Sequence, residues 1–464
     1  MIRLLSSLFL CLLLGSTSLL SAAGSKPNFI FILADDMGWN DAGFCGNPTV
    51  DTPNLNALAK SGVVFSQAYA SAPNCAPTRA CLLTGQYTPR HGVYTVVDER
   101  HKPGSPHQKI LAADSQAELP ASATTLPEAL KPAGYATALF GMWNLGRGRS
   151  GNGSPTAQGF DLYVEPKDLG FEKDAYLRND GAYTSDALTD GALKWMAGLQ
   201  NQPFFLYLAF HDVHAPYDPK PDLLEKYKAR PGVVDPLLAA SVEAMDANIG
   251  RLLEGVNRMG FSGNTYIVFT SDNGGTRQYI APLRGGKGTL YEGGLRVPAI
   301  VSGPGIAGNR VSKTNILTMD FYPTFLEIAG ITAPASHTLD GVSLMPLLTG
   351  KTDDITRDLF WHFPSYSGPT SPCSAMQSQH WKVIEFFETG TTEIYNLAED
   401  PSEANNLAPR QPERTQALLA KLHNWQSDIH APRPTAPNPQ FDPNAIHDSS
   451  REARGKNPGG KQKS

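Results

Sequence analysis

The stretch PNFIFILADDMGW, residues 27–39, decides the fold. Residues 28–34 form a short apolar run, which is typical of a strand that is buried on both faces, and the run ends in two aspartates. A second stretch, TYIVFTSDNGG at 265–275, repeats the pattern and ends in Asp-Asn-Gly-Gly. In open α/β sheets, ligands bind beyond the carboxyl ends of the strands. The two stretches therefore indicate an α/β sheet with a polar site at one edge.

The rest of the first 340 residues extends this α/β pattern. Apolar runs at 136–140, 203–210 and 298–303 predict further buried strands, and helical patterns cover 184–199 and 235–258. Strands that alternate with helices predict a largely parallel or mixed central sheet sandwiched by helices. After about residue 341 the pattern changes to short strands joined by turns, which predicts a smaller subdomain built on an antiparallel sheet.

These changes divide the chain. Residues 1–23 carry a basic residue, Arg3, near their start, continue with an apolar run and end in a small-residue cleavage site, as a secretory signal peptide does. We expect a catalytic α/β domain at 24–340, an antiparallel subdomain at 341–430 and a mobile tail at 431–464, where the composition turns to Pro, Asn, Lys and Gly. No other apolar run is long enough to span a membrane, so the expected location is periplasmic or secreted.

Composition narrows the functional class. The formal net charge of −5 argues against nucleic acid or an anionic membrane as a partner. Beyond the signal peptide the chain keeps four cysteines, at positions 45, 75, 81 and 373. Four cysteines in so long a chain do not make a disulfide scaffold, so a hydrophobic core must stabilise the fold.

The strand ends carry candidate metal ligands. Asp35, Asp36, Asp272 and Asn273 all offer oxygen, which suits a hard cation such as Ca²⁺ or Mg²⁺ better than Zn²⁺. The amide slightly favours Ca²⁺. Asp-Asp and Asp-Asn-Gly also occur as plain turns. Two such motifs, each directly after a buried strand, make the metal interpretation the stronger one.

Cys75 begins a helical pattern in SAPNCAPTRACLLTG, residues 71–85. Taken alone, it is open to four interpretations: a metal ligand, half of a disulfide, a nucleophile or a buried filler. A helix N-terminus attracts anions, and Arg79 adds a bidentate donor close by. These residues suit an oxyanion held beside a metal.

At this point the chain resembles the type I sulfatases of the alkaline phosphatase superfamily. CAPTR at 75–79 matches the family's C-x-P-x-R signature, and the resemblance continues through HDVHAP, AMDANIGRLL, SDNGG, PLRGGKGTLYEGGLRVP and IYNLAEDPSEANNLA. It implies that a formylglycine-generating enzyme oxidises Cys75 to formylglycine, whose hydrate attacks sulfur. It also implies one cation, held by the four strand-end residues together with position 75.

The resemblance further assigns roles in hydrolysis of a sulfated carbohydrate, such as a glycosaminoglycan or an algal polysaccharide. Arg79 would hold the aldehyde hydrate, Lys287 would contact the sulfate ester, and His214 would donate a proton to the departing alcohol. The candidate substrate contacts are Asn144, Arg147, His211 and His362.

The chain departs from the family at GMWNLG, residues 141–146, where the family has Gly-Lys-Trp-His-Leu-Gly. Met142 replaces a lysine that touches sulfate, and Asn144 replaces a histidine that accepts the diol proton. Asparagine is no base near neutral pH. Either turnover is slow, or another group takes the proton, with His211 as the first candidate.

Three functional readings follow from this departure. In the first, the enzyme is active and re-equipped by Arg147, Arg149 or His211. In the second, it is a catalytically impaired relic that binds sulfated glycans. In the third, it is a phosphoester or phosphonate hydrolase on the same fold. The retained Cys75 motif, metal quartet, Lys287 and His214 favour the active sulfatase.

Overall fold

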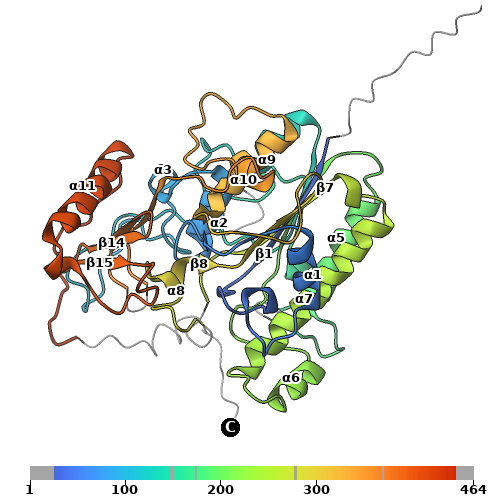
Figure 1. Cartoon of the computed structure of the whole chain (residues 1–464), viewed down its shortest axis with the longest axis horizontal. Coiled ribbons are helices and arrows are strands. Elements are labelled where there is room, and N and C mark those ends of the chain that lie inside the picture. The colour runs from blue at the N-terminus through green and yellow to red at the C-terminus, as the bar shows by residue number, and fades with distance from the viewer. Residues whose placement is uncertain (1–25, 147–150, 173–174, 276–279, 368–369, 446–464) are drawn as a thin grey trace, which may run out of the picture.

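The computed structural model describes residues 26–146, 151–172, 175–275, 280–367 and 370–445 (Figure 1). The predicted signal peptide at 1–23, and also Arg147 and Arg149, lie outside these residues. Within them, no helix is long and apolar enough to cross a membrane.

An eight-stranded mixed sheet forms the centre of the molecule, with strand order β10-β2-β9-β7-β1-β6-β4-β5. In this order the strands are Arg310–Ser312, Val63–Phe65, Ala299–Ser302, Thr265–Ser271, Asn28–Ala34, Phe204–Ala209, Ala136–Gly141 and Leu162–Val164. Strand β1 pairs in parallel with both β6 and β7, whereas β9 is antiparallel to its neighbours β7 and β2. The predicted largely parallel, mixed sheet is confirmed.

Helices cover both faces of this sheet because side chains of β1 alternate between two cores. Phe29, Phe31 and Leu33 pack on one side, and Ile30 and Ile32 pack on the other. The first side is covered by α2 (Cys75–Thr84), α4 (Leu126–Leu130), α9 (Phe321–Ala329) and α10 (Met345–Leu348). The second is covered by α1 (Pro53–Ser61), α5 (Thr184–Ala197) and α7 (Pro236–Arg258), with α6 (Pro221–Lys228) packed on α7 (Figure 1).

Short elements complete the domain. Strands β3 (Ala68–Tyr69), β8 (Arg296–Val297) and β11 (Ile316–Leu317) form a three-stranded sheet. Helices α3 (Thr88–His91) and α8 (Glu292–Leu295) are single turns. Further 3-10 turns lie at Gly43–Cys45, Lys131–Ala133, Pro166–Leu169, Ser262–Asn264, Thr318–Asp320 and Ala408–Arg410.

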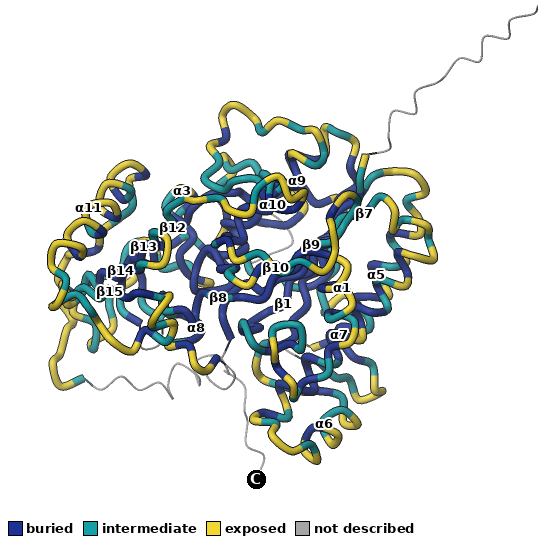
Figure 2. The backbone as a smooth tube through the Cα atoms, viewed as in Figure 1, coloured by how far each residue is buried: buried dark blue, intermediate teal, exposed yellow. Residues whose placement is uncertain are grey.

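The C-terminal subdomain is a four-stranded antiparallel sheet, as predicted, in the order β12 (Asp358–Phe363), β13 (Cys373–Ser378), β14 (Trp381–Phe386) and β15 (Thr392–Asn396). Helix α11 (Pro412–Asp428) packs on one face of the sheet, and its outer side is exposed (Figure 2). The opposite face packs against β3, α8 and β11 of the larger domain. The two cores are therefore continuous through a buried interface.

The first part of the expected mobile tail makes defined contacts. The backbone N–H groups of Leu111 and Asn438 donate to the carbonyls of Ala436 and Lys109, at 2.9 Å each. The Asn438 amide also donates to the carbonyl of Ser105, at 2.9 Å. Residues 431–445 are thus tied to the 105–111 segment, which the composition of the tail did not indicate.

Candidate active site

The metal candidates meet because their strands are neighbours. Ala34 at the end of β1 lies opposite Ser271 at the end of β7, so the residues that follow each strand lie side by side. The Asp36 N–H donates to Asp272 Oδ1 at 3.2 Å, and the Asn273 amide donates to Asp36 Oδ1 at 2.8 Å. Asp35, Asp36, Asp272 and Asn273 are all buried. The structure therefore brings together the four residues that the strand-end pattern predicted.

This cluster fits a cation. Asp35 Oδ1 and Asn273 Oδ1 are buried and have no hydrogen-bond partner among the described residues. Ligand atoms of Asp35, Cys75 and Asp272 lie within 4.8 Å of one another. Burial raises the pKa of Asp35 well above its ordinary value, Asp272 raises it further, and Arg79 offsets only part of this rise. Buried carboxyl and amide oxygens without partners are the surroundings that a hard cation would satisfy.

Cys75 is the first residue of α2 and faces this cluster. It is 4% exposed, and burial raises the pKa of its thiol to about 12. The anionic charges of Asp35 and Asp272 add to that rise, and Lys287 opposes it. A thiol with this pKa stays protonated at neutral pH, so the unmodified cysteine is a poor nucleophile.

Arg79 lies one turn further along α2 and is fully buried. Its guanidinium donates to Asp272 Oδ2 at 3.0 and 2.7 Å and to Asp35 Oδ2 at 3.1 Å. A further N–H group donates to the carbonyl of Met142 at 2.5 Å. Arg79 therefore fixes both carboxylates and the end of β4 around Cys75.

Lys287 also lies beside this cluster. Its ammonium nitrogen lies 2.6 Å from Asp36 Oδ1, and its backbone N–H donates to the carbonyl of Gly275 at 3.1 Å. Burial alone would lower the pKa of Lys287, but the carboxylates of Asp36, Asp35 and Asp272 help to raise it well above its ordinary value. Lys287 thus supplies a permanent positive charge beside position 75.

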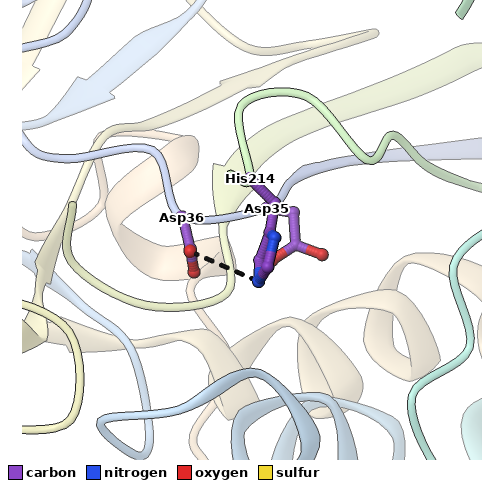
Figure 3. Close-up of side chains that lie close together, drawn as sticks. All are labelled: Asp35, Asp36 and His214. Carbon is purple, nitrogen blue, oxygen red and sulfur yellow. Dashed lines mark ion pairs between the residues drawn. The ribbon is translucent and has the colours of Figure 1, made fainter. Parts of the chain in front are cut away.

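His214 lies beside the same carboxylates, as Figure 3 shows. Its Nε2 is 3.7 Å from Asp36 Oδ2, and its Nδ1 contacts the carbonyl oxygen of Ala215. An Nδ1 held by a carbonyl carries the proton there, which leaves Nε2 facing the cluster. The His214 side chain remains partly exposed, so the ring can contact a molecule that enters the site.

His211 is next to His214 but in a different state from the one expected. Its ring stacks on Tyr176 at 4.8 Å and on His214 at 5.3 Å between centroids. Burial, and then the charge of His214, lower the pKa of His211 to about 3. His211 therefore does not have the ordinary histidine pKa that was expected of a substitute base.

Residues that hold the His211–His214 turn were missed by the sequence analysis. The Tyr176 hydroxyl donates to the carbonyl of His211 at 2.8 Å and also contacts that of His214. The Tyr183 hydroxyl donates to Asp212 Oδ1 at 2.7 Å. Asp212 was visible inside HDVHAP, but nothing in the local pattern linked the two tyrosines to it.

The remaining candidate substrate contacts differ in position and burial. Asn144 is half-buried just after β4, with a positive φ of 56°. Arg147 lies outside the described residues. His362 is 2% exposed, with Nδ1 2.6 Å from Ser374 Oγ and Nε2 2.9 Å from the carbonyl of Pro432. Both nitrogens of His362 are occupied within the C-terminal subdomain, so the predicted substrate contact is at odds with its position.

Comparisons with known proteins agree with this geometry. Residues 27–331 match the Sulfatase family model, and residues 286–430 match the model for the C-terminal part of N-sulphoglucosamine sulphohydrolase. A sulfatase from Formosa agariphila is 32% identical, across 90% of this chain and 92% of that protein. Human arylsulfatase A is 30% identical, across 86% and 87%. The crystal structure of Ps i-CgsB covers 93% of this chain and 97% of its own, with 27% identity and a TM-score of 0.73; it was also solved with a neocarrahexaose.

Proposed function

This chain belongs to the sulfatase family and is a sulfuric ester hydrolase, and on that premise we propose that it is exported and removes sulfate from a carbohydrate. The proposal includes a bound divalent cation, with Ca²⁺ as the first candidate and Mg²⁺ as the second. It also includes conversion of Cys75 to formylglycine by a maturation enzyme.

The observation that carries the proposal is the pair of buried, unpartnered oxygens beside Cys75. Asp35 Oδ1 and Asn273 Oδ1 have no hydrogen-bond donor among the described residues. Arg79 pairs with Asp35 and Lys287 pairs with Asp36, so two positive charges lie beside the cluster. A tetrahedral oxyanion such as the sulfate group of an ester suits a site that combines a cation with fixed cationic donors.

The cation would be held by Asp35, Asp36, Asp272 and Asn273, with position 75 next to them. When bound, it supplies Lewis-acid assistance and lowers the pKa of a coordinated hydroxyl. The chain's own contribution is orientation. Arg79 binds one oxygen of Asp35 and one of Asp272, and this leaves Asp35 Oδ1 directed to a ligand.

Conversion of Cys75 explains why a thiol of such high pKa stands at the centre of the site. An aldehyde hydrate at this position supplies a hydroxyl nucleophile, which would form a bond to sulfur as the alcohol leaves. Loss of the proton from the second hydroxyl would then break the C–O bond to the sulfate group, release sulfate and restore the aldehyde, and water would add to the aldehyde to regenerate the hydrate. The N-terminus of α2 and the Lys287 ammonium would stabilise the charge that develops there.

Proton transfer to the leaving alcohol is the proposed role of His214. Its Nδ1–H donates to the carbonyl of Ala215, so the proton given to the alcohol is a second one, carried on Nε2 by the doubly protonated ring. Tyr176 fixes the turn that carries His214. This arrangement keeps the ring beside Asp36 while the outer edge of the ring faces an incoming ester.

Met142 and Asn144 favour slow turnover over a site in which another residue has taken the role of the missing base. His211 is held neutral by burial, and a group whose pKa is about 3 accepts a proton weakly at neutral pH. The Met142 side chain offers no charge. The kept Cys75, Arg79 and Lys287 still favour an enzyme over a relic that only binds.

A sulfated polysaccharide fragment is the proposed substrate class. Support comes from the similar structure of Ps i-CgsB, which was also solved in complex with a neocarrahexaose. The decisive experiment expresses the full chain with a formylglycine-generating enzyme and measures sulfate release from a panel of sulfated oligosaccharides. Matched phosphate and phosphonate esters form the control panel. Faster turnover of the phosphorus esters would favour the other activity of this fold.

A further inference from the structure

A fully buried lysine lies between the two domains, away from the cluster around Cys75. Lys382 of β14 has no exposed side-chain surface, and its ammonium nitrogen is 3.0 Å from Glu292 Oε1 and 2.9 Å from Glu403 Oε1. Both carboxylates are also buried. Buried charges are costly unless they are paired, so each member of this trio depends on the others.

The trio is anchored on α8 of the larger domain. Glu292 is the first residue of α8, and its backbone N–H donates to Glu403 Oε2 at 2.7 Å. The Tyr69 hydroxyl donates to Glu292 Oε2 at 3.0 Å, and Arg296 lies 3.5 Å from the same oxygen. The C-terminal subdomain therefore fixes α8 by one ion pair and one backbone hydrogen bond.

Helix α8 is bonded in turn to both loops of the site. The Gly274 N–H, directly after Asn273, donates to the carbonyl of Gly294 at 2.9 Å. The Gly293 N–H donates to the carbonyl of Arg284 at 2.8 Å, at the start of the loop that carries Lys287. A shift in the position of α8 would therefore move both the turn that contains Asn273 and the loop that contains Lys287.

The packing around α8 leaves no slack for such a shift. A Cβ on Gly274 would lie 2.1 Å from the carbonyl oxygen of Gly293. A Cβ on Gly294 would lie 2.3 Å from the carbonyl oxygen of Thr289 and 2.4 Å from that of Gly286. The backbones touch directly, so movement at one is transmitted to the next.

We propose that Lys382 is a positioning residue for sulfate ester hydrolysis, and that through Glu292 and α8 it sets the places of Asn273 and Lys287. The C-terminal subdomain is then part of the catalytic unit and not only a wall of the site. The inference rests on the proposed roles of Asn273 and Lys287 in the larger domain.

The test compares two variants of the full, matured chain. Lys382→Met leaves two buried carboxylates without their cation and therefore destabilises the fold. The triple variant Glu292→Gln, Lys382→Met, Glu403→Gln removes all three charges. The control is Val383→Ala, since Val383 is the next residue of β14 and packs on the opposite face, against α11. Readouts are kcat and KM for para-nitrophenyl sulfate, Ca²⁺ affinity by calorimetry, and thermal stability.

We expect the triple variant, at temperatures where it is folded, to lose kcat by about tenfold or more and to bind Ca²⁺ more weakly, because small misplacements of catalytic groups are costly. KM should change less than kcat. Val383→Ala should lower thermal stability and leave both readouts close to wild type. A triple variant whose kcat and Ca²⁺ affinity match those of the wild-type protein would overturn the inference.

A second pair isolates the backbone hydrogen bond. Glu403→Gln keeps a side-chain oxygen that accepts from the Glu292 N–H, whereas Glu403→Met does not. If Glu403→Gln keeps the wild-type kcat and Ca²⁺ affinity and Glu403→Met does not, the positioning role is supported. Equal kcat and Ca²⁺ affinity in the two variants would refute that role. If the wild-type protein releases no sulfate, the proposed function fails, and Ca²⁺ affinity alone then decides the inference about Lys382.

Discussion

The ammonium nitrogen of Lys287 lies 2.6 Å from Oδ1 of Asp36, so a proposed sulfate contact is also the partner of a proposed metal ligand. The same oxygen of Asp36 accepts from the Asn273 amide at 2.8 Å. Burial would raise the pKa of Asp36, but Lys287 and His214 reverse this effect and lower it. The carboxylate is therefore kept ionised in a buried site, ready for a cation.

Because of this pairing, the effect of Lys287 on turnover can be separated from its effect on cation binding. In Lys287→Ala, we expect kcat to fall about a hundredfold or more, equivalent to ~2.7–4 kcal/mol, because one charged donor to the transition state is lost. Ca²⁺ affinity should be unchanged or higher, since a competing positive charge has been removed from Asp36. Steady-state kinetics and calorimetry on the same sample test this, and a parallel loss of Ca²⁺ binding would contradict it.

Cation binding should stabilise the fold. A ligand at about a hundredfold above its Kd adds ~2.7 kcal/mol to the free energy of unfolding. We expect Ca²⁺ to raise the melting temperature of the wild-type protein and to have little effect on Asp35→Asn, which removes the charge and keeps the shape. Asp358→Asn, in an exposed ion pair with Lys421, is the control. The same melting-temperature shift in wild type and Asp35→Asn would rule out Asp35 as a ligand.

The strand-end residues were predictable because their chemistry follows directly from local sequence. Two buried strands ending in Asp-Asp and Asp-Asn indicate that the four metal candidates lie together, as they do in the structure, since parallel neighbours end at one edge of a sheet. The substrate contact predicted for His362 is at odds with its buried position, and a histidine in an aromatic-rich strand carries no local sign of whether Ser374 and Pro432 contact its nitrogens.

Long-range contacts explain the rest of what the sequence did not provide. Lys382 meets Glu292 and Glu403 only after two domains have packed, and no spacing along the chain encodes that meeting. The short strands β3, β8 and β11 contain two residues each, too few for an alternating pattern. The pKa of His211 depends on burial beneath Tyr176, which is also set by tertiary packing.

That lowered pKa changes what His211 is expected to do. Because burial holds the ring neutral down to a pH of about 3, His211 should cause no rise in kcat/KM between about pH 5 and about pH 8. His211→Phe keeps the stack on Tyr176 and should retain turnover within about tenfold. A pH–rate profile of both proteins checks this. Loss of a limb near pH ~6.5 in the variant would identify His211 as the base after all.

Restoring the residues typical of the family tests the slow-turnover reading. In Met142→Lys with Asn144→His, we expect faster sulfate release, by about a hundredfold or more, because a charged donor and a base return to the site. The backbone there should stay in place, since Arg79 binds the Met142 carbonyl and not its side chain. Each single substitution is the control. A slower double variant would mean that the site has been rebuilt around methionine and asparagine.

Glu403 gives the fold a pH dependence of predictable sign. Burial raises its pKa to about 7, and the charge of Lys382 only partly opposes this. The folded state therefore binds the proton more tightly than the unfolded chain does, and this stabilisation is complete below the unfolded pKa of ~4.3 and lost as pH rises through about 7. Relative to wild type, Glu403→Gln should gain in free energy of unfolding between about pH 5 and about pH 8. Urea unfolding at several pH values measures this difference, and a constant difference would contradict the assignment.

The central claim is that Cys75 is the precursor of the catalytic group. The most direct test is the mass of the tryptic peptide that contains residue 75, taken from protein that is releasing sulfate after expression with a formylglycine-generating enzyme. The account predicts an aldehyde or its hydrate in place of the –CH₂SH side chain, in proportion to the activity of the preparation. An unmodified cysteine in fully active protein would contradict it.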